Sequence, residues 1–252
     1  MSVSAVVVSH GDAVDLAVSL PILVEQVDEV LVIANVPDSA GGVPPVVRVL
    51  ENPKPLGFAA NANRGIAETK RDLVLLANPD AVPEPGAVAT LRDFVQSHPR
   101  CGIAGPRMIG VHGELVPSRR RFPTVRGTLV RRTPLRRLRP PLERQREHYH
   151  LGDEPDEPVQ TDWLLGGFML LRRAMLEELG GLDAGFRLYG EDIDLAYRAA
   201  KAGWERWYVP GAVVRHEWKR ETDARFLTRR TLWHWRGIAR FVRKHPETLA
   251  RL

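Results

Sequence analysis

The chain has 252 residues and a formal net charge of +5, and 44% of its residues are hydrophobic. This composition excludes a disordered or fibrous protein. No run of about 18 uncharged apolar residues occurs, so we expect no membrane-spanning helix. The first residues carry no basic segment typical of a secretion signal, and the single Cys101 cannot form an internal disulfide. Both features favour a reducing, cytoplasmic setting.

The first half of the chain alternates short apolar runs with helical patterns. We expect strands at 3–9, 29–34, 46–51, 73–77 and 103–108, and helices at 12–26 (capped by Asp12), 57–69 and 83–97. This alternation predicts an α/β fold with a Rossmann-like, mostly parallel central sheet flanked by helices. Ligands of such sheets bind beyond the carboxyl ends of the strands. Asn78 and Asp80 follow one of these ends.

The second half is less regular. Residues 118–160 are rich in arginine and proline with little periodicity, which predicts a long, partly mobile insertion. We expect later elements at 162–172 (a strand broken by two glycines), 173–179, 191–202, 206–209, 213–216 and 222–245. The chain therefore divides into a first half at 1–110, a second half at 111–221 and a terminal helical region at 222–252.

Basic residues are concentrated in two segments. Residues 119–146 contain eleven arginines and one acid, and residues 215–252 contain eleven lysines and arginines and four acids. This asymmetry favours a polyanionic partner, such as nucleic acid, an anionic membrane surface or a phosphorylated ligand; a solvated surface paired with acidic residues is the alternative. Residues 225–243 form an amphipathic pattern with a basic face, suited to a membrane surface or to packing on the core.

Three polar clusters interrupt apolar segments. Asp80, in Asn78-Pro79-Asp80, suits a hard cation that also binds phosphate oxygens, although these residues also favour a plain turn. The second cluster is Glu191, Asp192 and Asp194. Glu191 and Asp192 precede a helix, whose dipole favours their ionised forms. An ionised carboxylate can accept a proton from a hydroxyl, and N-capping is the alternative.

The third cluster is His216 at a strand end, a candidate metal or phosphate ligand or a structural histidine. Gly166 and Gly167 permit close backbone approach, and Trp163 offers a flat face for a sugar ring, with core packing as the alternative. We also expect Asp194 to pair with Arg198, four residues later on the same helix. The dinucleotide fingerprint and the P-loop are both absent.

These clusters, in this order, resemble the family 2 glycosyltransferases, which have a GT-A fold. The resemblance runs from residue 3 to about residue 216 and is carried by VVVSHGD, NPKPLGFAANANRGI, LLANPDA, WLLGGFMLLRR, YGEDIDLAYRAAKAGW and VVRHEW. Gly57, Phe58, Asn63 and Gly65 match one family segment, NPD looks like a variant of its D-x-D metal motif, and EDIDL looks like its motif for the catalytic base. ANPDA, EDIDLAYR and RRRFPT look most like bacterial rhamnosyltransferases that act on polyprenyl-diphosphate-linked sugars.

The resemblance implies an inverting, Mg²⁺- or Mn²⁺-dependent transfer of a sugar from a nucleoside-diphosphate donor, with rhamnose from dTDP-rhamnose as the preferred assignment. The acceptor would be a hydroxyl of a saccharide or of a polyprenyl-diphosphate-linked sugar. It implies a nucleotide-sugar-binding half at 1–110 and an acceptor-binding, catalytic half at 111–221. It also implies a cytoplasmic protein, with peripheral contact at the inner face of the membrane as an alternative.

The implied site residues fall into four groups. Asp192 would be the catalytic base, with Glu191 beside it. The donor would contact His10, Asp12, Asn35, Asn63, Asn78 and Asp80. The acceptor would contact Trp163, Gly166, Gly167, Arg120 and Arg121. Asp80 and His216 would hold the metal.

The chain departs from the family pattern at two strand ends. His10-Gly11 replaces the usual Tyr-Asn, and Ala34-Asn35 replaces an aspartate that contacts the nucleoside, for which Asp12, Asn35 or Asp38 could substitute. NPD lacks the first acid of D-x-D, so metal binding would rest on Asp80. The competing functions are a glycosyltransferase-like protein that binds a sugar nucleotide with little or no turnover, and a nucleic-acid-binding module, which no recognised motif supports.

Overall fold

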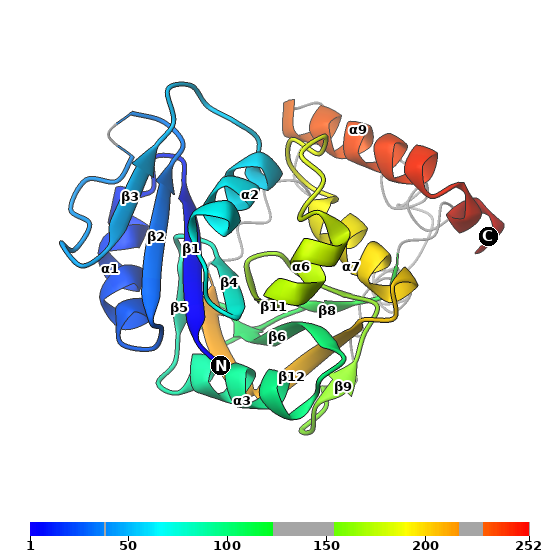
Figure 1. The fold of residues 1–252 in the computed structure, drawn as a ribbon, viewed down its shortest axis with the longest axis horizontal. Helices are drawn as coiled ribbons and strands as arrows, with labels where there is room; N and C mark the ends of the chain where they lie inside the picture. Colours follow the sequence, from blue (N-terminus) through cyan, green and yellow to red (C-terminus); the bar gives the residue numbers. More distant parts are fainter. Residues whose placement is uncertain (38, 123–153, 217–228, 252) are drawn as a thin grey trace.

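One large sheet runs through the molecule. The computed structural model describes residues 1–37, 39–122, 154–216 and 229–251 (Figure 1). The strands of this sheet are β1 (Val3–Ser9), β2 (Glu29–Ala34), β3 (Arg48–Glu51), β4 (Leu73–Ala77), β5 (Ala81–Pro83), β6 (Cys101–Ile109), β7 (Leu115–Val116), β9 (Val159–Gln160), β11 (Phe168–Arg172) and β12 (Glu205–His216). Their order is β3-β2-β1-β4-β11-β6-β12-β5, with β7 paired to β6 and β9 paired to β12.

The sheet is mixed. β3, β2, β1 and β4 are parallel, as are β6 and β12. β11 lies antiparallel between β4 and β6, and β5 is antiparallel to β12. The predicted α/β class with a mostly parallel central sheet is confirmed, with an antiparallel strand at its centre that the apolar pattern alone does not reveal.

Helices cover both faces of the sheet. They are α1 (Ala13–Val24), α2 (Phe58–Glu68), α3 (Ala87–Ser97), α6 (Arg173–Leu179), α7 (Glu191–Lys201) and α9 (Arg229–Lys244), followed by the 3-10 helix η2 (Pro246–Arg251). Alternate residues of β1 pack on opposite faces, because Ala5 and Val7 belong to the core with α1 and α3, whereas Val6 belongs to the core with α2, α6 and α7. A Cβ on Gly65 would collide with the Val6 side chain, so this glycine allows α2 to lie close to β1.

The predicted strand at 162–172 is two strands. Trp163–Leu164 forms β10, which pairs with β8 (Arg119–Arg120) in a separate two-stranded sheet, and β11 then enters the main sheet. The glycine pair between them allows this change of partner. The irregular segment predicted at 118–160 therefore begins with β8 and ends with β9; residues 123–153 lie outside the described residues.

Other boundaries differ for local reasons. The expected strands at 206–209 and 213–216 form the single strand β12, with a register shift between Val209 and Val213. β5 was not expected because it is only three residues long, and α3 begins at Ala87 rather than at residue 83. The predicted C-terminal region contains α9 and η2, and residues 222–228 lie outside the described residues. Within the described ranges, no helix has the length and apolar character needed to span a bilayer.

Candidate active site

The turn Asn78-Pro79-Asp80 connects β4 to β5. The backbone N–H of Asn78 donates to the carbonyl of Gly167 at 2.8 Å. His216 ends β12 and pairs in register with Ala81, the first residue of β5. Its Nε2 therefore lies 3.4 Å from Oδ1 of Asp80 and 3.2 Å from Nδ2 of Asn78. The structure thus brings Asp80 and His216 together, as the sequence predicted.

Two consecutive glycines connect this cluster to Asp192. A Cβ on Gly167 would lie 2.9 Å from Nε2 of His216, and a Cβ on Gly166 would lie 3.5 Å from the Asp192 side chain. The backbone N–H of Gly166 also donates to Oδ2 of Asp192, at 3.3 Å. Asp192 and the Asp80–His216 pair therefore approach the same dipeptide, although they are far apart in the sequence.

Glu191 and Asp192 lie in the first turn of α7, inside the helix rather than before it. Glu191 is buried and its Oε2 makes no hydrogen bond. Burial, together with the charge of Asp192, raises the pKa of Glu191 to about 8. Burial also raises the pKa of Asp192, against the opposing effects of the Ile193 N–H, the Arg120 charge and the Gly166 N–H. The prediction that the helix dipole keeps both groups ionised is therefore wrong for Glu191, because desolvation outweighs the dipole.

The two acids share an environment that tolerates one negative charge better than two. Asp192 has backbone N–H partners and the nearby Arg120 guanidinium, and Glu191 has an unpartnered oxygen. The proton is therefore held preferentially by Glu191 and the negative charge by Asp192. This distribution makes Asp192 the carboxylate able to accept a further proton.

Asp80 and His216 offer a divalent cation one carboxylate oxygen and one imidazole nitrogen. Their 3.4 Å separation is near the ~3 Å expected for two ligands that bind one ion at ~2.1 Å from perpendicular directions. Among the described residues, no group of three or more His, Cys, Asp or Glu side chains could hold a metal. The pair fits a cation that takes its other ligands from phosphate oxygens and water, as Mg²⁺ commonly does.

A network of asparagine amides lies at the ends of β2 and β3. Oδ1 of Asn35 accepts from Nδ2 of Asn52 and from the Leu56 N–H, each at 2.8 Å, and its Nδ2 donates to the Leu56 carbonyl at 3.0 Å. Nδ2 of Asn52 also donates to Oδ1 of Asn61 at 2.5 Å. Asn35, Asn52 and Asn61 are all buried. The network joins three segments at the carboxyl side of the parallel strands.

The exposed end of this network is His10. The backbone groups of Leu56 fix which amide atom of Asn35 is oxygen, so Nδ2 of Asn35 must donate to Nδ1 of His10, at 2.8 Å. Neutral His10 therefore carries its proton on Nε2. Both hydrogens of the Asn35 amide are donated to protein partners, and its oxygen accepts two hydrogen bonds. The contact of Asn35 with the donor stays a prediction.

Two other predicted donor residues have partners within the protein. Asp12 occupies the predicted N-cap position of α1, but its Oδ2 accepts the backbone N–H of His10 at 2.7 Å, and its side chain makes no capping bond to the helix. Asn63 forms two hydrogen bonds with the backbone of Leu182, at 2.7 and 2.9 Å. Residue 38, the other candidate for the missing aspartate, lies outside the described residues.

Trp163 does not present a face to a sugar ring. It is only 3% exposed and packs in the core. The guanidinium of Arg120 lies 4.9 Å from the ring centroid, and the indole N–H donates to the Arg121 carbonyl at 2.8 Å. The predicted sugar stacking is therefore wrong, and core packing was the correct alternative. Arg120 is buried near Asp192, whereas Arg121 is exposed.

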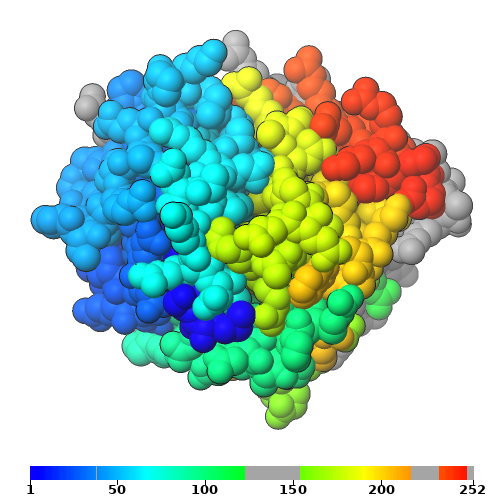
Figure 2. Space-filling model, viewed as in Figure 1, coloured from blue at the N-terminus to red at the C-terminus, as the bar shows by residue number. Residues whose placement is uncertain are grey.

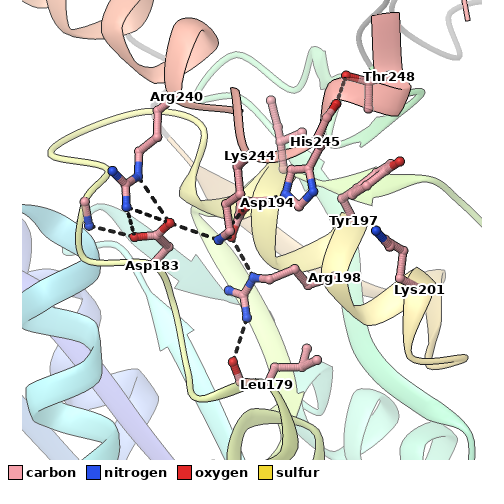
Figure 3. A network of polar contacts seen from close by, with 12 residues as sticks. Leu179, Asp183, Asp194, Tyr197, Arg198, Lys201, Arg240, Lys244, His245 and Thr248 are labelled. Carbon is pink, nitrogen blue, oxygen red and sulfur yellow. Dashed lines mark hydrogen bonds and ion pairs between the residues drawn. The ribbon is translucent and has the colours of Figure 1, made fainter. Parts of the chain in front are cut away.

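Sequence reasoning missed a second polar network beside α7 (Figure 3). The expected pair of Asp194 with Arg198 is confirmed, at 2.7 Å. Asp194 is also bound by Lys244 and His245, at 2.9 and 2.8 Å. No local spacing signals these contacts, because the partners are 50 and 51 residues away along the chain.

The chain is similar in sequence to known proteins. The family model described as "Glycosyltransferase like family 2" matches residues 3–235. An N-acetylglucosaminyl-diphospho-decaprenol L-rhamnosyltransferase of Mycobacterium tuberculosis is 34% identical over 185 residues, which cover 68% of this chain and 59% of the relative. Rhamnosyltransferase WbbL of Escherichia coli K12 is 33% identical over 82 residues, covering 32% of this chain and 31% of the relative. The chain thus matches about three fifths of the length of the mycobacterial relative.

The fold is also that of solved GT-A enzymes. The crystal structure of GalNAc-T7 with UDP, GalNAc and Mn²⁺ superposes with a TM-score of 0.69 at 17% identity, covering 99% of this chain and 51% of that chain. At this identity the likeness concerns the fold alone. Together with the family model, which spans most of the chain, these matches show that the protein belongs to glycosyltransferase family 2.

Proposed function

We propose that this protein is an inverting, metal-dependent rhamnosyltransferase that transfers the sugar of dTDP-rhamnose to a hydroxyl of a lipid-linked saccharide. The observation that carries the proposal is the contact of Gly166-Gly167 with Asp192 on one side and with the Asp80–His216 pair on the other. A candidate base and a candidate diphosphate site are thereby held next to each other. Direct transfer between two bound substrates needs this adjacency.

Asp192 acts on the acceptor. Its carboxylate accepts the proton of the acceptor hydroxyl as the hydroxyl oxygen forms a bond to the anomeric carbon. The bond from that carbon to the diphosphate oxygen breaks on the opposite face, and its electron pair leaves with the nucleoside diphosphate. One displacement inverts the anomeric configuration. Protonated Glu191 leaves the negative charge on Asp192, and Arg120 stabilises that charge.

Asp80 and His216 would hold the divalent cation, Mg²⁺ or Mn²⁺. When bound, the cation neutralises charge that develops on the leaving diphosphate. Nδ2 of Asn78 lies 3.2 Å from the same Nε2 of His216, so a cation bound to this nitrogen would replace the contact with the amide. Because only two protein ligands are available, we expect cation affinity to rise when a diphosphate supplies further oxygens.

The substrates are proposed from the relatives. The mycobacterial relative is named for transfer of L-rhamnose to a decaprenol-linked diphosphate sugar, and the E. coli relative is named a rhamnosyltransferase. At the donor end, exposed His10 is available to the nucleotide. At the acceptor end, Arg121 is exposed next to buried Arg120, and guanidinium groups bind phosphates well. We therefore place the protein in the cytoplasm, with contact at the inner membrane surface where such an acceptor resides.

The test is donor turnover with and without Mn²⁺, in the native protein and in Asp192→Asn. We expect turnover to require the cation and to fall about a thousandfold in the variant, as for loss of a general base, while donor binding persists. Asp93→Asn, which changes an exposed carboxylate on α3, is the matched control. Undiminished turnover in Asp192→Asn would reject Asp192 as the base. Donor binding without any turnover by the native protein would instead support a sugar-nucleotide-binding protein.

A further inference from the structure

Helix α9 lies against the loop that leads into α7. This loop, residues 180–190, ends directly before Glu191 and Asp192. Figure 1 shows α9 crossing above α7, and Figure 2 shows the C-terminal segment packed against the neighbouring part of the surface. The contacts between α9 and this loop run from Trp233 to Lys244.

The first half of α9 contacts the end of the loop. The guanidinium of Arg187 lies 5.0 Å from the ring centroid of Trp233, and the rings of Tyr189 and His234 are 5.7 Å apart. A Cβ on Gly237 would lie 2.6 Å from the Tyr189 carbonyl oxygen. Glycine at this position therefore lets the helix touch the loop backbone.

The second half of α9 binds the beginning of the loop through charges. Arg240 donates to both oxygens of Asp183, at 2.7 and 3.0 Å from one nitrogen, and Lys244 contacts the same carboxylate at 2.9 Å (Figure 3). Although burial opposes it, these hydrogen bonds hold the pKa of Asp183 below its usual range. Phe241 packs with Phe186 beneath the pairs.

Lys244 connects this loop to α7, the helix that carries Asp192. Its Nζ also lies 2.9 Å from Asp194, which is fully buried and stands two residues after Asp192. Asp194 receives further hydrogen bonds from Arg198 on α7 and from His245. A buried carboxylate that loses one of several cationic partners is destabilised strongly, so this group links the positions of α7 and α9.

The loop between these contacts is conformationally constrained. Tyr189 has a φ of 68°, and among the described residues it is the one non-glycine residue with a positive φ; Gly190 follows at 98°. A tyrosine in this region is strained and persists because its surroundings hold it there. The loop also touches the donor half, where the Phe58 N–H donates to the Arg187 carbonyl at 3.1 Å.

We propose that α9 is a positioning element of the active site, with Arg240 and Lys244 as its positioning residues. They fix the loop at 180–190 and the first turn of α7, and so set the place of the Asp192 carboxylate relative to Gly166. This inference rests on the proposed function, in which Asp192 is the base. Neither residue touches substrate in this scheme; each acts through Asp183 and Asp194.

The test uses Arg240→Met and Lys244→Met, with Arg240→Lys as the conservative variant. The matched control is Lys201→Met, which breaks another ion pair between α7 and the C-terminal segment, Lys201 with Glu247 at 2.9 Å, at the end of α7 away from Asp192. Donor-saturated turnover, the KM for the donor and amide hydrogen exchange of residues 182–193 are measured for each folded variant.

We expect kcat to fall about tenfold or more in the two methionine variants, because small displacements of a catalytic group reduce rates steeply. The donor KM should stay within about twofold, exchange at 182–193 should accelerate, and Arg240→Lys should recover most of kcat. Unchanged kcat with accelerated exchange, or an equal fall in Lys201→Met, would overturn the inference. Failure of the proposed function is recognised separately, because native protein would then show no turnover while the exchange differences remain.

Discussion

The two ends of the candidate site are built from different chemistry. At the donor end, the neutral amides of Asn35, Asn52 and Asn61 are buried and hydrogen-bonded mainly to one another and to backbone, with Arg64 and His10 as their side-chain partners at the edge of the network. At the base end, carboxyl groups are buried, and their charges are stabilised by cations or suppressed by a raised pKa.

The two ends therefore differ in how their hydrogen bonds depend on pH. Amides keep the same hydrogen bonds across the physiological pH range, because they do not titrate. Buried carboxyl groups respond to pH and to loss of a partner charge. We therefore expect the contacts among Asn35, Asn52 and Asn61 to contribute stability that is independent of pH, and the base end to make both stability and activity depend on pH.

The largest expected effect concerns the glycine pair that joins the two ends. In Gly167→Ala, the new methyl group would lie 2.9 Å from Nε2 of His216 and 3.4 Å from Nδ2 of Asn78, so the imidazole must move. We expect kcat/KM for sugar transfer to fall about a hundredfold, measured with saturating Mn²⁺.

The neighbouring position provides the control. In Gly166→Ala the nearest contact is 3.5 Å, an ordinary van der Waals distance to Asp192. We expect this variant to keep kcat/KM within about fivefold of the native value, since nothing has to shift. Equal losses in the two variants would mean that the spacing between the two ends is not set by Gly167.

A medium effect is expected at the donor end. Asn52→Ala removes hydrogen bonds to Asn35, Asn61 and Arg64 and leaves the buried oxygens of Asn35 and Asn61 short of donors; none of these three partners changes its charge between about pH 5 and about pH 8. The free energy of unfolding should fall by about 1–3 kcal/mol, and by the same amount at about pH 5 and about pH 8, as measured by urea denaturation. A loss that differs clearly between the two pH values would contradict the pH-independent character of this network.

An effect of a different kind, a change in how stability depends on pH, is expected at the base end. The pKa of Glu191 is raised from 4.5 to about 8, so the folded protein keeps a proton that the unfolded chain releases as pH rises through this interval. The free energy of unfolding therefore decreases with rising pH. Glu191→Gln cannot ionise, so its stability should decrease less between about pH 5 and about pH 8, by urea denaturation.

Exposed Glu177 on α6 serves as the comparison for that measurement. Glu177→Gln should retain the native dependence of stability on pH. If Glu191→Gln retains it as well, a group other than Glu191 must be responsible for the slope.

Much of the fold could be predicted because, in the first half of the chain, the apolar runs and the polar turns that follow them mark the strands and their ends. The run Leu73–Ala77 is apolar on both faces and is followed directly by Asn78-Pro79-Asp80, so both the buried strand and its functional end are evident. The antiparallel direction of β11 was not predictable, since a buried strand has the same apolar pattern in either direction. The division of the expected strand at 162–172 into β10 and β11 was not predictable either, because β10 pairs with β8, which is far away in the sequence.

The candidate site could be predicted where a motif contains a carboxylate or an imidazole, because these side chains have few chemical roles. Asp80, Asp192 and His216 were identified from motifs, and the structure groups them around one dipeptide. Trp163 was misjudged, because sequence does not tell a buried indole from an exposed one. The protonation of Glu191 was also missed, because desolvation depends on packing by residues far away in the chain.

The pairing of His216 with Ala81 has a consequence for biosynthesis. The imidazole that lies against Asn78 comes from 138 residues later in the chain, on β12, which is the last strand in chain order within the described ranges. Until that strand has emerged from the ribosome and docked, Asp80 has no imidazole beside it. A nascent or truncated chain that lacks His216 would therefore be unable to assemble the Asp80–His216 pair.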